Sequence, residues 1–191
     1  MAIKESSDEL NPAVVVAQRT VAATSTSWNA TDYLALAIAT FGVGYLPLIP
    51  GTFGSLLSVG IFLLFTQLAT GTALFVLVLL FTLVVTFAGI WAASRTEELS
   101  GRKDPGKVVV DEVAGQYIAL LPLVPKLDPG WISIITAFLL FRLFDIVKPY
   151  PARRLEGLES GLGIMADDIV AGAYAAVATS IIIAVGMLVL S

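Results

Sequence analysis

The 191-residue chain contains neither cysteine nor histidine. Without cysteine, the protein has no disulfide bonds, thiolate nucleophiles or cysteine-ligated zinc. Without histidine, a Ser-His-Asp triad, a phosphohistidine intermediate and an imidazole metal site are excluded as well. An enzyme built from this sequence must therefore use carboxylates, hydroxyls, lysine, arginine and backbone dipoles, with a hard, oxygen-preferring cation as the only suitable metal.

Charge is also scarce, since only 14% of the residues are charged and 57% are hydrophobic. The mean hydropathy of +0.89 is far above the value of a water-soluble domain and indicates a membrane protein. Residues 33–94 contain no Asp, Glu, Lys or Arg at all. The net charge of −4 argues against nucleic acid as a partner.

The apolar stretches predict an all-α, polytopic membrane helical bundle with about five apolar segments. A helix needs about 20 apolar residues to cross a bilayer core of about 30 Å. The third and fourth segments are short, so residues 113–141 either span the membrane or form a re-entrant hairpin. A turn at Gly71 joins the first two segments as a tight hairpin. The five segments are 56–69, 73–93, 113–124, 131–140 and 169–190.

The distribution of basic residues orients these segments. Eight of the 11 basic residues lie in two connections, 95–107 and 142–154, whereas the opposite connections contain only Lys126. The positive-inside rule places the two basic connections in the cytoplasm and Ser191 outside. We expect residues 1–30 to be a mobile cytoplasmic tail and residues 31–191 to be the membrane-embedded domain, with a short helix over 31–41.

A segment rich in glycine and proline, residues 42–55, leads into the first apolar segment. Glycine allows the backbone to approach a ligand closely, and free N–H groups at a helix N-terminus bind phosphate. Thr52, Gly54 and Ser55 are therefore candidate phosphate-binding residues. For this segment alone, a helix start shaped by proline and glycine for structural reasons is the simpler interpretation.

Two pairs of adjacent carboxylates each open an apolar segment: Asp111 with Glu112, and Asp167 with Asp168. The structural alternative is that they only complement the dipole of a helix N-terminus. However, Gln116 lies one turn beyond Glu112 on the same face, so this polar stripe enters the membrane region, where a helix cap would not require it. Two neighbouring carboxylates also disfavour each other's ionised form unless a cation lies between them.

A further charged cluster ends the fourth apolar segment. At helical spacing Arg142, Asp145 and Lys148 share one face, and Pro149 and Pro151 then end the helix. One interpretation is a self-neutralising helix end whose long side chains reach the surface. The other is a functional site, which the closeness of Asp145 to the apolar core favours, because a charge there is costly.

The topology brings these clusters to one membrane face, where they predict a phosphate-processing site. Oxygen ligands without histidine or cysteine suit Mg²⁺, and phosphorus would be attacked either by a water that the cation activates or by an aspartate. The candidate metal ligands are Asp111, Glu112, Asp145, Asp167 and Asp168. The candidate catalytic residues are Asp111, Glu112, Asp145 and Asp168. The basic candidates for holding the phosphate are Arg142, Lys148 and Arg154.

Four blocks of the sequence, spread over residues 41–172, resemble the phosphatidylglycerophosphatase A family. They are GYLPLIPGTFGS (44–55), VVVDEVAGQ (108–116), FRLFDIVKPYP (141–151) and GLGIMADDIVAG (161–172). One departure is Ser160, where the family more often has glycine. The resemblance implies a bacterial inner-membrane enzyme that uses Mg²⁺ to hydrolyse phosphatidylglycerophosphate to phosphatidylglycerol and phosphate. The family's charged motif positions fall on Asp111, Glu112, Arg142, Asp145, Lys148, Asp167 and Asp168.

Two other functions compete with this hypothesis. A small-solute or ion transporter with a cytoplasm-facing carboxylate site would explain charges beside broken apolar segments, but the charges lie at one face and the chain has no internal repeat. A membrane scaffold would leave the carboxylate clusters without a role. The sequence carries no signal for the oligomeric state or for a preference among acyl chains.

Overall fold

The computed structural model describes residues 28–124 and 130–190. Every regular element in this part of the chain is a helix, which confirms the all-α class. The expected tail over residues 1–30 lies outside the described residues, except for its last three. The helices are α2 (Ala30–Thr40), α3 (Pro50–Leu68), α4 (Gly71–Ser100), α5 (Val110–Leu120), α6 (Trp131–Val147), α7 (Ala152–Leu155) and α8 (Ser160–Leu190), with short 3-10 turns η1 (Val43–Tyr45) and η2 (Leu121–Leu123).

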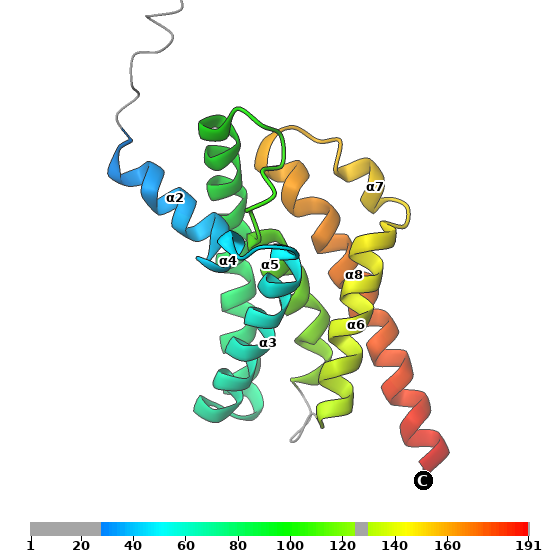
Figure 1. Ribbon diagram of the computed structural model, residues 1–191. Helices are drawn as coiled ribbons and strands as arrows, with labels where there is room; N and C mark the ends of the chain where they lie inside the picture. The colour runs from blue at the N-terminus through cyan, green and yellow to red at the C-terminus, as the bar shows by residue number, and fades with distance from the viewer. Residues whose placement is uncertain (1–27, 125–129, 191) are drawn as a thin grey trace, which may run out of the picture.

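Helix α5 forms the centre of the bundle and contacts α3, α4, α6 and α8. Helices α3, α4, α5, α6 and α8 alternate in direction, so the α4–α5 and α6–α8 connections lie at the same end of the molecule (Figure 1). Most of α5 is buried, including Val113, Tyr117 and Leu120. Because its neighbours cover it, α5 needs neither the length nor the uniformly apolar surface of a helix that faces lipid.

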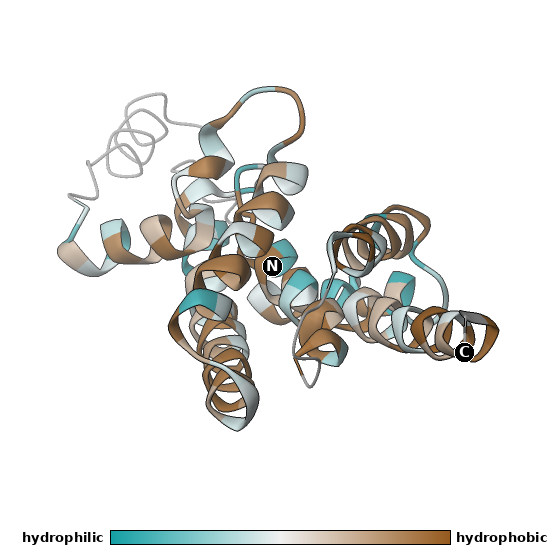
Figure 2. Ribbon diagram, turned by 90° about the horizontal axis from the view of Figure 1, so that it is seen from below, coloured by the Kyte–Doolittle hydropathy of each residue, from teal (hydrophilic) through white to brown (hydrophobic). Residues whose placement is uncertain are grey.

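Three helices, α3, α4 and α8, are long and apolar enough to cross a membrane. Hydrophobic residues dominate the ribbons of the bundle (Figure 2), and large apolar side chains such as Phe87 and Val177 are exposed on its surface. The other two expected segments are α5 and α6, which have 11 and 17 residues. The total of about five spans stays a prediction.

Local sequence signals explain where several helices begin and end. A capping box starts α2, in which the Asn29 side chain accepts from the backbone N–H of Asp32 and the Asp32 side chain accepts from that of Asn29. Only Ala69 and Thr70 separate α3 from α4, and Gly71 has a positive φ of 57°, which confirms the tight hairpin. The expected short helix over 31–41 is α2.

Close contact between α5 and α8 depends on two glycines. A side chain at Gly172 would collide with the backbone carbonyl of Gly115, and one at Gly115 would collide with the Phe141 ring and the Asp168 carbonyl. The two helix backbones therefore approach each other directly, as small residues allow in membrane bundles. This crossing brings the start of α5 beside the second and third turns of α8.

Candidate active site

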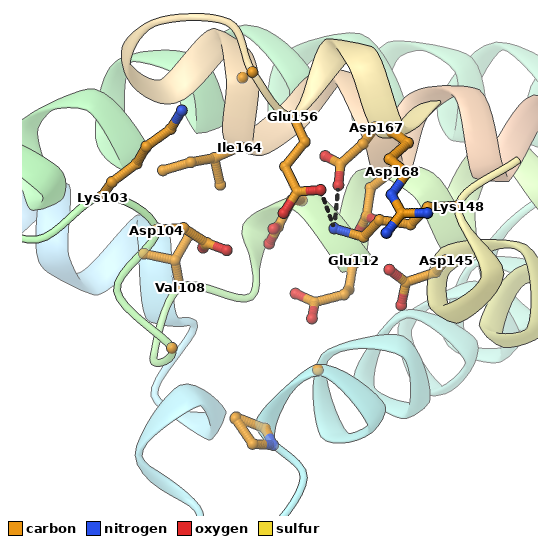
Figure 3. Close-up of a pocket in the computed structure, with 17 residues that line it drawn as sticks. Lys103, Asp104, Val108, Glu112, Asp145, Lys148, Glu156, Ile164, Asp167 and Asp168 are labelled. Carbon is orange, nitrogen blue, oxygen red and sulfur yellow. Dashed lines mark hydrogen bonds and ion pairs between the residues drawn. The ribbon is translucent and has the colours of Figure 1, made fainter. Parts of the chain in front are cut away.

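A cavity of about 640 Å³ lies where the start of α5 meets the starts of α3 and α8 and the end of α6 (Figure 3). Charged side chains dominate its wall, with seven carboxylates and three cations. The charged lining residues are Lys103, Asp104, Asp111, Glu112, Asp145, Lys148, Arg153, Glu156, Asp167 and Asp168. A phosphate dianion entering this cavity would meet an excess of negative charge unless a cation accompanied it.

Asp111, Glu112 and Asp168 form the tightest carboxylate group. One oxygen of each lies within 4.8 Å of the corresponding oxygens of the other two. Each side chain also has a buried oxygen without a hydrogen-bond partner: Oδ1 of Asp111, Oε2 of Glu112 and Oδ2 of Asp168. Buried polar atoms are normally satisfied, so this donor set fits a hard divalent cation that prefers oxygen ligands.

The structure corrects one expectation about the Asp167–Asp168 pair. The sequence placed these residues at the start of the last helix, but α8 begins at Ser160, two turns earlier. Helix-dipole stabilisation is confined to the first turn, so it does not account for either carboxylate. The extra turns hold Gly161, whose N–H donates to Oγ of Ser94 (3.0 Å) in α4. They were missed because glycines and the two carboxylates interrupt the apolar pattern there.

Asp145 lines the cavity and forms an ion pair with Arg142, in which Nη1 and Oδ2 are 2.7 Å apart. Arg142 Nη1 also donates to Oγ of Ser55 (3.4 Å), which in turn donates to the carbonyl of Gly51 (3.1 Å). Arg142 is therefore placed between α6 and α3 and is not among the residues lining the cavity. Its predicted contact with phosphate stays a prediction.

Lys148 extends into the cavity from the end of α6. Its Nζ is 2.7 Å from Oδ2 of Asp167 and 3.4 Å from Oε2 of Glu156 (Figure 3). Burial alone would lower the pKa of Lys148, but the hydrogen bond to Asp167 and the surrounding carboxylates raise it above its ordinary value. Lys148 therefore carries a full positive charge in the cavity and can bind an anion.

The other predicted phosphate-binding residues lie farther from the cavity. Thr52, Gly54 and Ser55 belong to the first turns of α3 and do not line it, whereas the preceding Pro50 and Gly51 do. A side chain at Gly51 would collide with Oε1 of Glu112. Glycine at this position therefore lets α3 approach the carboxylates.

Four charged lining residues were missing from the sequence-based site: Lys103, Asp104, Arg153 and Glu156. Arg153 takes the place expected of its neighbour Arg154, whose guanidinium carbon lies 5.2 Å from the centre of the Tyr150 ring. The dense charge of residues 102–107 was the available signal for Lys103 and Asp104. No periodicity distinguishes Arg153 from Arg154, because α7 has only four residues.

Comparisons with known proteins agree with this geometry. The family model described as "Phosphatidylglycerophosphatase A" matches residues 36–183. A Bacteroides thetaiotaomicron protein named "Putative phosphatidylinositol-3-phosphatase" is 44% identical over 144 residues, covering 75% of this chain and 89% of that protein. No solved structure matches the chain.

Two relatives carry the name phosphatidylglycerophosphatase A. The Haemophilus influenzae protein is 39% identical over 138 residues, covering 72% of this chain and 80% of its own length. The Escherichia coli protein is 36% identical over 137 residues, covering 71% and 75%. The family model spans most of the described helices and every residue that lines the carboxylate cavity. The chain is a phosphatase and belongs to the phosphatidylglycerophosphatase A family.

Proposed function

We propose that this protein hydrolyses the terminal phosphate monoester of phosphatidylglycerophosphate, giving phosphatidylglycerol and inorganic phosphate, with Mg²⁺ as cofactor. One observation carries the proposal. Three carboxylates with unpartnered oxygens, Asp111, Glu112 and Asp168, share a cavity with Lys148 and Arg153. This combination suits a cation that binds phosphate on one side and protein oxygens on the other.

Asp111, Glu112 and Asp168 are the residues that would hold Mg²⁺, because one oxygen of each lies close to those of the other two and each side chain has an oxygen without a hydrogen-bond partner. Held there, Mg²⁺ would supply positive charge, which stabilises the negative charge that develops on a phosphate during transfer. Asp145 and Asp167 were also candidate ligands, but each forms an ion pair at 2.7 Å, with Arg142 and Lys148 respectively. A basic side chain therefore already balances the charge of each of these two carboxylates, so neither is placed among the metal ligands.

The basic residues of the cavity bind and orient the phosphate. Lys148 and Arg153 offer N–H donors from the end of α6 and from α7, and Lys103 adds a third cation from the α4–α5 connection. Donors of this kind stabilise the equatorial phosphate oxygens in the transition state. Because basic residues from three elements bind the phosphate oxygens, the phosphate is held with its phosphorus oriented for in-line attack.

Asp145 is the best-placed residue to activate the nucleophile. It lines the cavity, lies outside the three converging carboxylates and is oriented by Arg142. In one route it accepts the proton of the attacking water. In the other, an aspartate attacks phosphorus to form an aspartyl-phosphate, which a water then hydrolyses to phosphate and the free carboxylate. In both routes the phosphorus–oxygen bond to the glycerol breaks, and the released oxygen takes up a proton to give phosphatidylglycerol. Trapping of a phosphoenzyme with hydroxylamine separates the routes, because only the second gives an acyl hydroxamate.

We further propose that the enzyme lies in the bacterial inner membrane with its cavity at the cytoplasmic face. The three long apolar helices support membrane insertion. The two connections rich in lysine and arginine lie at the end of the bundle that holds the cavity (Figure 1). The positive-inside rule assigns this end to the cytoplasm.

Purified full-length protein in mixed micelles tests the proposal by phosphate release from phosphatidylglycerophosphate. We expect turnover with Mg²⁺, loss of turnover in EDTA and recovery when Mg²⁺ is restored. The Asp168→Asn variant should lose activity by at least about 10²-fold, the usual effect of removing a group that stabilises transferring charge. Glu98→Gln is the matched control, because Glu98 is exposed, pairs with Arg95 and is not among the residues lining the cavity.

The same assay should include phosphatidylinositol 3-phosphate, because one relative is named for that lipid. Preference for phosphatidylglycerophosphate by at least about tenfold in kcat/KM, or about 1.4 kcal/mol, supports the proposed substrate. Preference for the inositol lipid would contradict it. Full activity in EDTA, or in Asp168→Asn, would contradict the metal site.

A further inference from the structure

The cavity can hold a phosphorylated headgroup, but its wall offers little to an acyl chain. Its larger apolar lining residues are Pro50, Val108 and Ile164, among ten charged ones. Moving one acyl CH₂ group from lipid into a polar site costs about 0.8 kcal/mol of transfer free energy. The chains of a lipid substrate must therefore stay in the bilayer while its phosphate is in the cavity, which requires an opening through the side of the bundle.

Helices α3 and α6 run antiparallel (Figure 1) and are joined where Arg142 Nη1 meets Oγ of Ser55 (3.4 Å). One turn from this contact, toward the cavity, Gly51 of α3 and Asp145 of α6 both line the cavity wall. The two helices therefore form one side of the cavity. The Arg142–Ser55 hydrogen bond joins them one turn farther from the cavity.

Exposed apolar side chains lie beside the start of α3 and at the end of α6, next to the residues that line the cavity. Leu48, two residues before α3, is 95% exposed, and Ile49 is 54% exposed. Ile146 is 74% exposed and lies four residues after Arg142, so it shares the α3-facing side of α6 one turn nearer the cavity. Figure 3 shows Glu112 and Asp145 at the side of the cavity nearest the cyan segment that leads into α3.

Leu48 also has an unusual backbone. Its φ is +81°, and the N–H of Ile49 donates to the carbonyl of Pro47 (3.2 Å), which is the hydrogen bond of a γ-turn. The γ-turn with positive φ is rare and strained for a residue other than glycine. This strained turn directs a leucine away from the protein, where it contributes nothing to the core. The fold alone does not explain leucine at this position.

We propose that Leu48, Ile49 and Ile146 form a lateral opening between α3 and α6, which the glycerol backbone and acyl chains of the lipid substrate occupy while its phosphate is in the cavity. The occupant is a membrane phospholipid, because α3 is a candidate membrane span and Gly51 in its first turn lines the cavity together with the carboxylates. This inference rests on the proposed lipid phosphatase function and adds the path by which the lipid enters.

Kinetics with two substrates test the opening. The substrates are long-chain phosphatidylglycerophosphate in mixed micelles and the same headgroup without its acyl chains, glycerophosphoglycerophosphate. Leu48→Gly, which relieves the positive φ, and Ile146→Gln should each lower kcat/KM for the lipid by about five- to tenfold, the loss expected for one apolar contact. The change should appear in KM, and turnover of the soluble substrate should remain within about twofold.

Leu68→Gln is the matched control, since Leu68 is 70% exposed at the opposite end of α3 and should not affect either substrate. An equal loss for both substrates, an unchanged lipid KM, or an equal effect of Leu68→Gln would overturn the opening. Failure of the wild type to hydrolyse phosphatidylglycerophosphate would instead contradict the proposed function.

A crosslinking experiment tests the opening independently of catalytic activity. Benzoylphenylalanine is placed at position 48 or at position 68, and the protein is irradiated in phosphatidylcholine vesicles containing phosphatidylglycerophosphate. Enrichment of the phosphorylated lipid at position 48 above its mole fraction, and not at position 68, supports the opening. Labelling at both positions in proportion to the vesicle composition overturns it.

Discussion

Asp111, Glu112 and Asp168 place three carboxylate oxygens within 4.8 Å of one another. Without a cation, neighbouring carboxylates in a partly buried site repel one another and destabilise the fold. We therefore expect Asp111→Asn to raise the stability of the metal-free protein by about 0.5–2 kcal/mol while it removes most of the activity, as is common where function requires unfavourable charge. Thermal unfolding in EDTA measures the first effect and phosphate release the second.

The same variant should lose the stabilisation that Mg²⁺ gives the wild type, because a ligand stabilises only the state that binds it. Melting curves with increasing Mg²⁺ should therefore shift upward for the wild type and for Glu98→Gln, and stay flat for Asp111→Asn. A parallel shift in Asp111→Asn would mean that this carboxylate does not contribute to the metal site.

Gly51 is a second residue at which a small change should affect function more than stability. A methyl group there would collide with Oε1 of Glu112, the end of a flexible side chain, so Glu112 would move and the helix would not. We expect Gly51→Ala to lower kcat/KM by at least about tenfold, because active sites tolerate little misplacement. Gly60→Ala is the control, since nothing lies within 4 Å of a side chain there. Wild-type activity of Gly51→Ala would contradict the placement of Glu112.

Among the helices, the α5–α8 crossing is the contact that assembles the carboxylates. A Cβ at Gly172 would meet the rigid backbone of Gly115, so Gly172→Ala should destabilise the protein by about 1–3 kcal/mol through overpacking. It should also lower activity by moving Asp168 away from Asp111. Gly186→Ala on the same helix has open space around it and should be neutral or slightly stabilising. Equal unfolding free energies for the two variants would argue against the close crossing.

Helix α2 is attached to α4 by an ion pair with a predictable pH dependence. The hydrogen bond from Nε of Arg95 to Oδ1 of Asp32 (2.8 Å) lowers the pKa of Asp32 below its ordinary value. A depressed carboxyl pKa gives stability that is fully present above the unfolded-state pKa, about 3.9, and is lost as the pH falls through the folded-state value.

The Asp32→Asn variant should therefore melt at a lower temperature than the wild type at pH 5–7, and the gap should narrow below about pH 4. Thermal unfolding across this range measures the gap. A difference that stays constant down to pH 2 would contradict this, because the ionised carboxylate is the acceptor both for Arg95 and for the N–H of Asn29 (3.0 Å) in the capping box.

At the scale of the whole molecule, the orientation in the membrane can be measured directly, because the chain has no cysteine to remove. Thr70 directly precedes α4 and Arg102 follows its end, so these two exposed residues lie at opposite ends of that helix. A membrane-impermeant maleimide should label Thr70→Cys in intact spheroplasts and Arg102→Cys only in inside-out vesicles. The opposite pattern would put the cavity on the outer face.

Most of the helical architecture was predictable from local pattern. The α3–α4 hairpin, the short α2 helix and the apolar part of α8 follow from hydrophobic runs and from Gly71. The early start of α8 at Ser160 did not follow, because residues 160–168 contain glycine and two carboxylates. That part of the helix is stabilised by contact with α4 and α5, which no local pattern encodes.

The sequence by itself determined the chemistry available to this protein. The absence of cysteine and histidine leaves carboxylates and basic side chains, and their position beside apolar runs brings them to one end of the helical bundle. Only the tertiary structure decided which of them converge. It brings Asp111, Glu112 and Asp168 together, pairs Asp145 and Asp167 with cations, and places Arg153 in the cavity while Arg154 stacks on Tyr150. The reason is that convergence depends on helix rotation and close glycine crossings, which involve residues more than 50 positions apart along the chain.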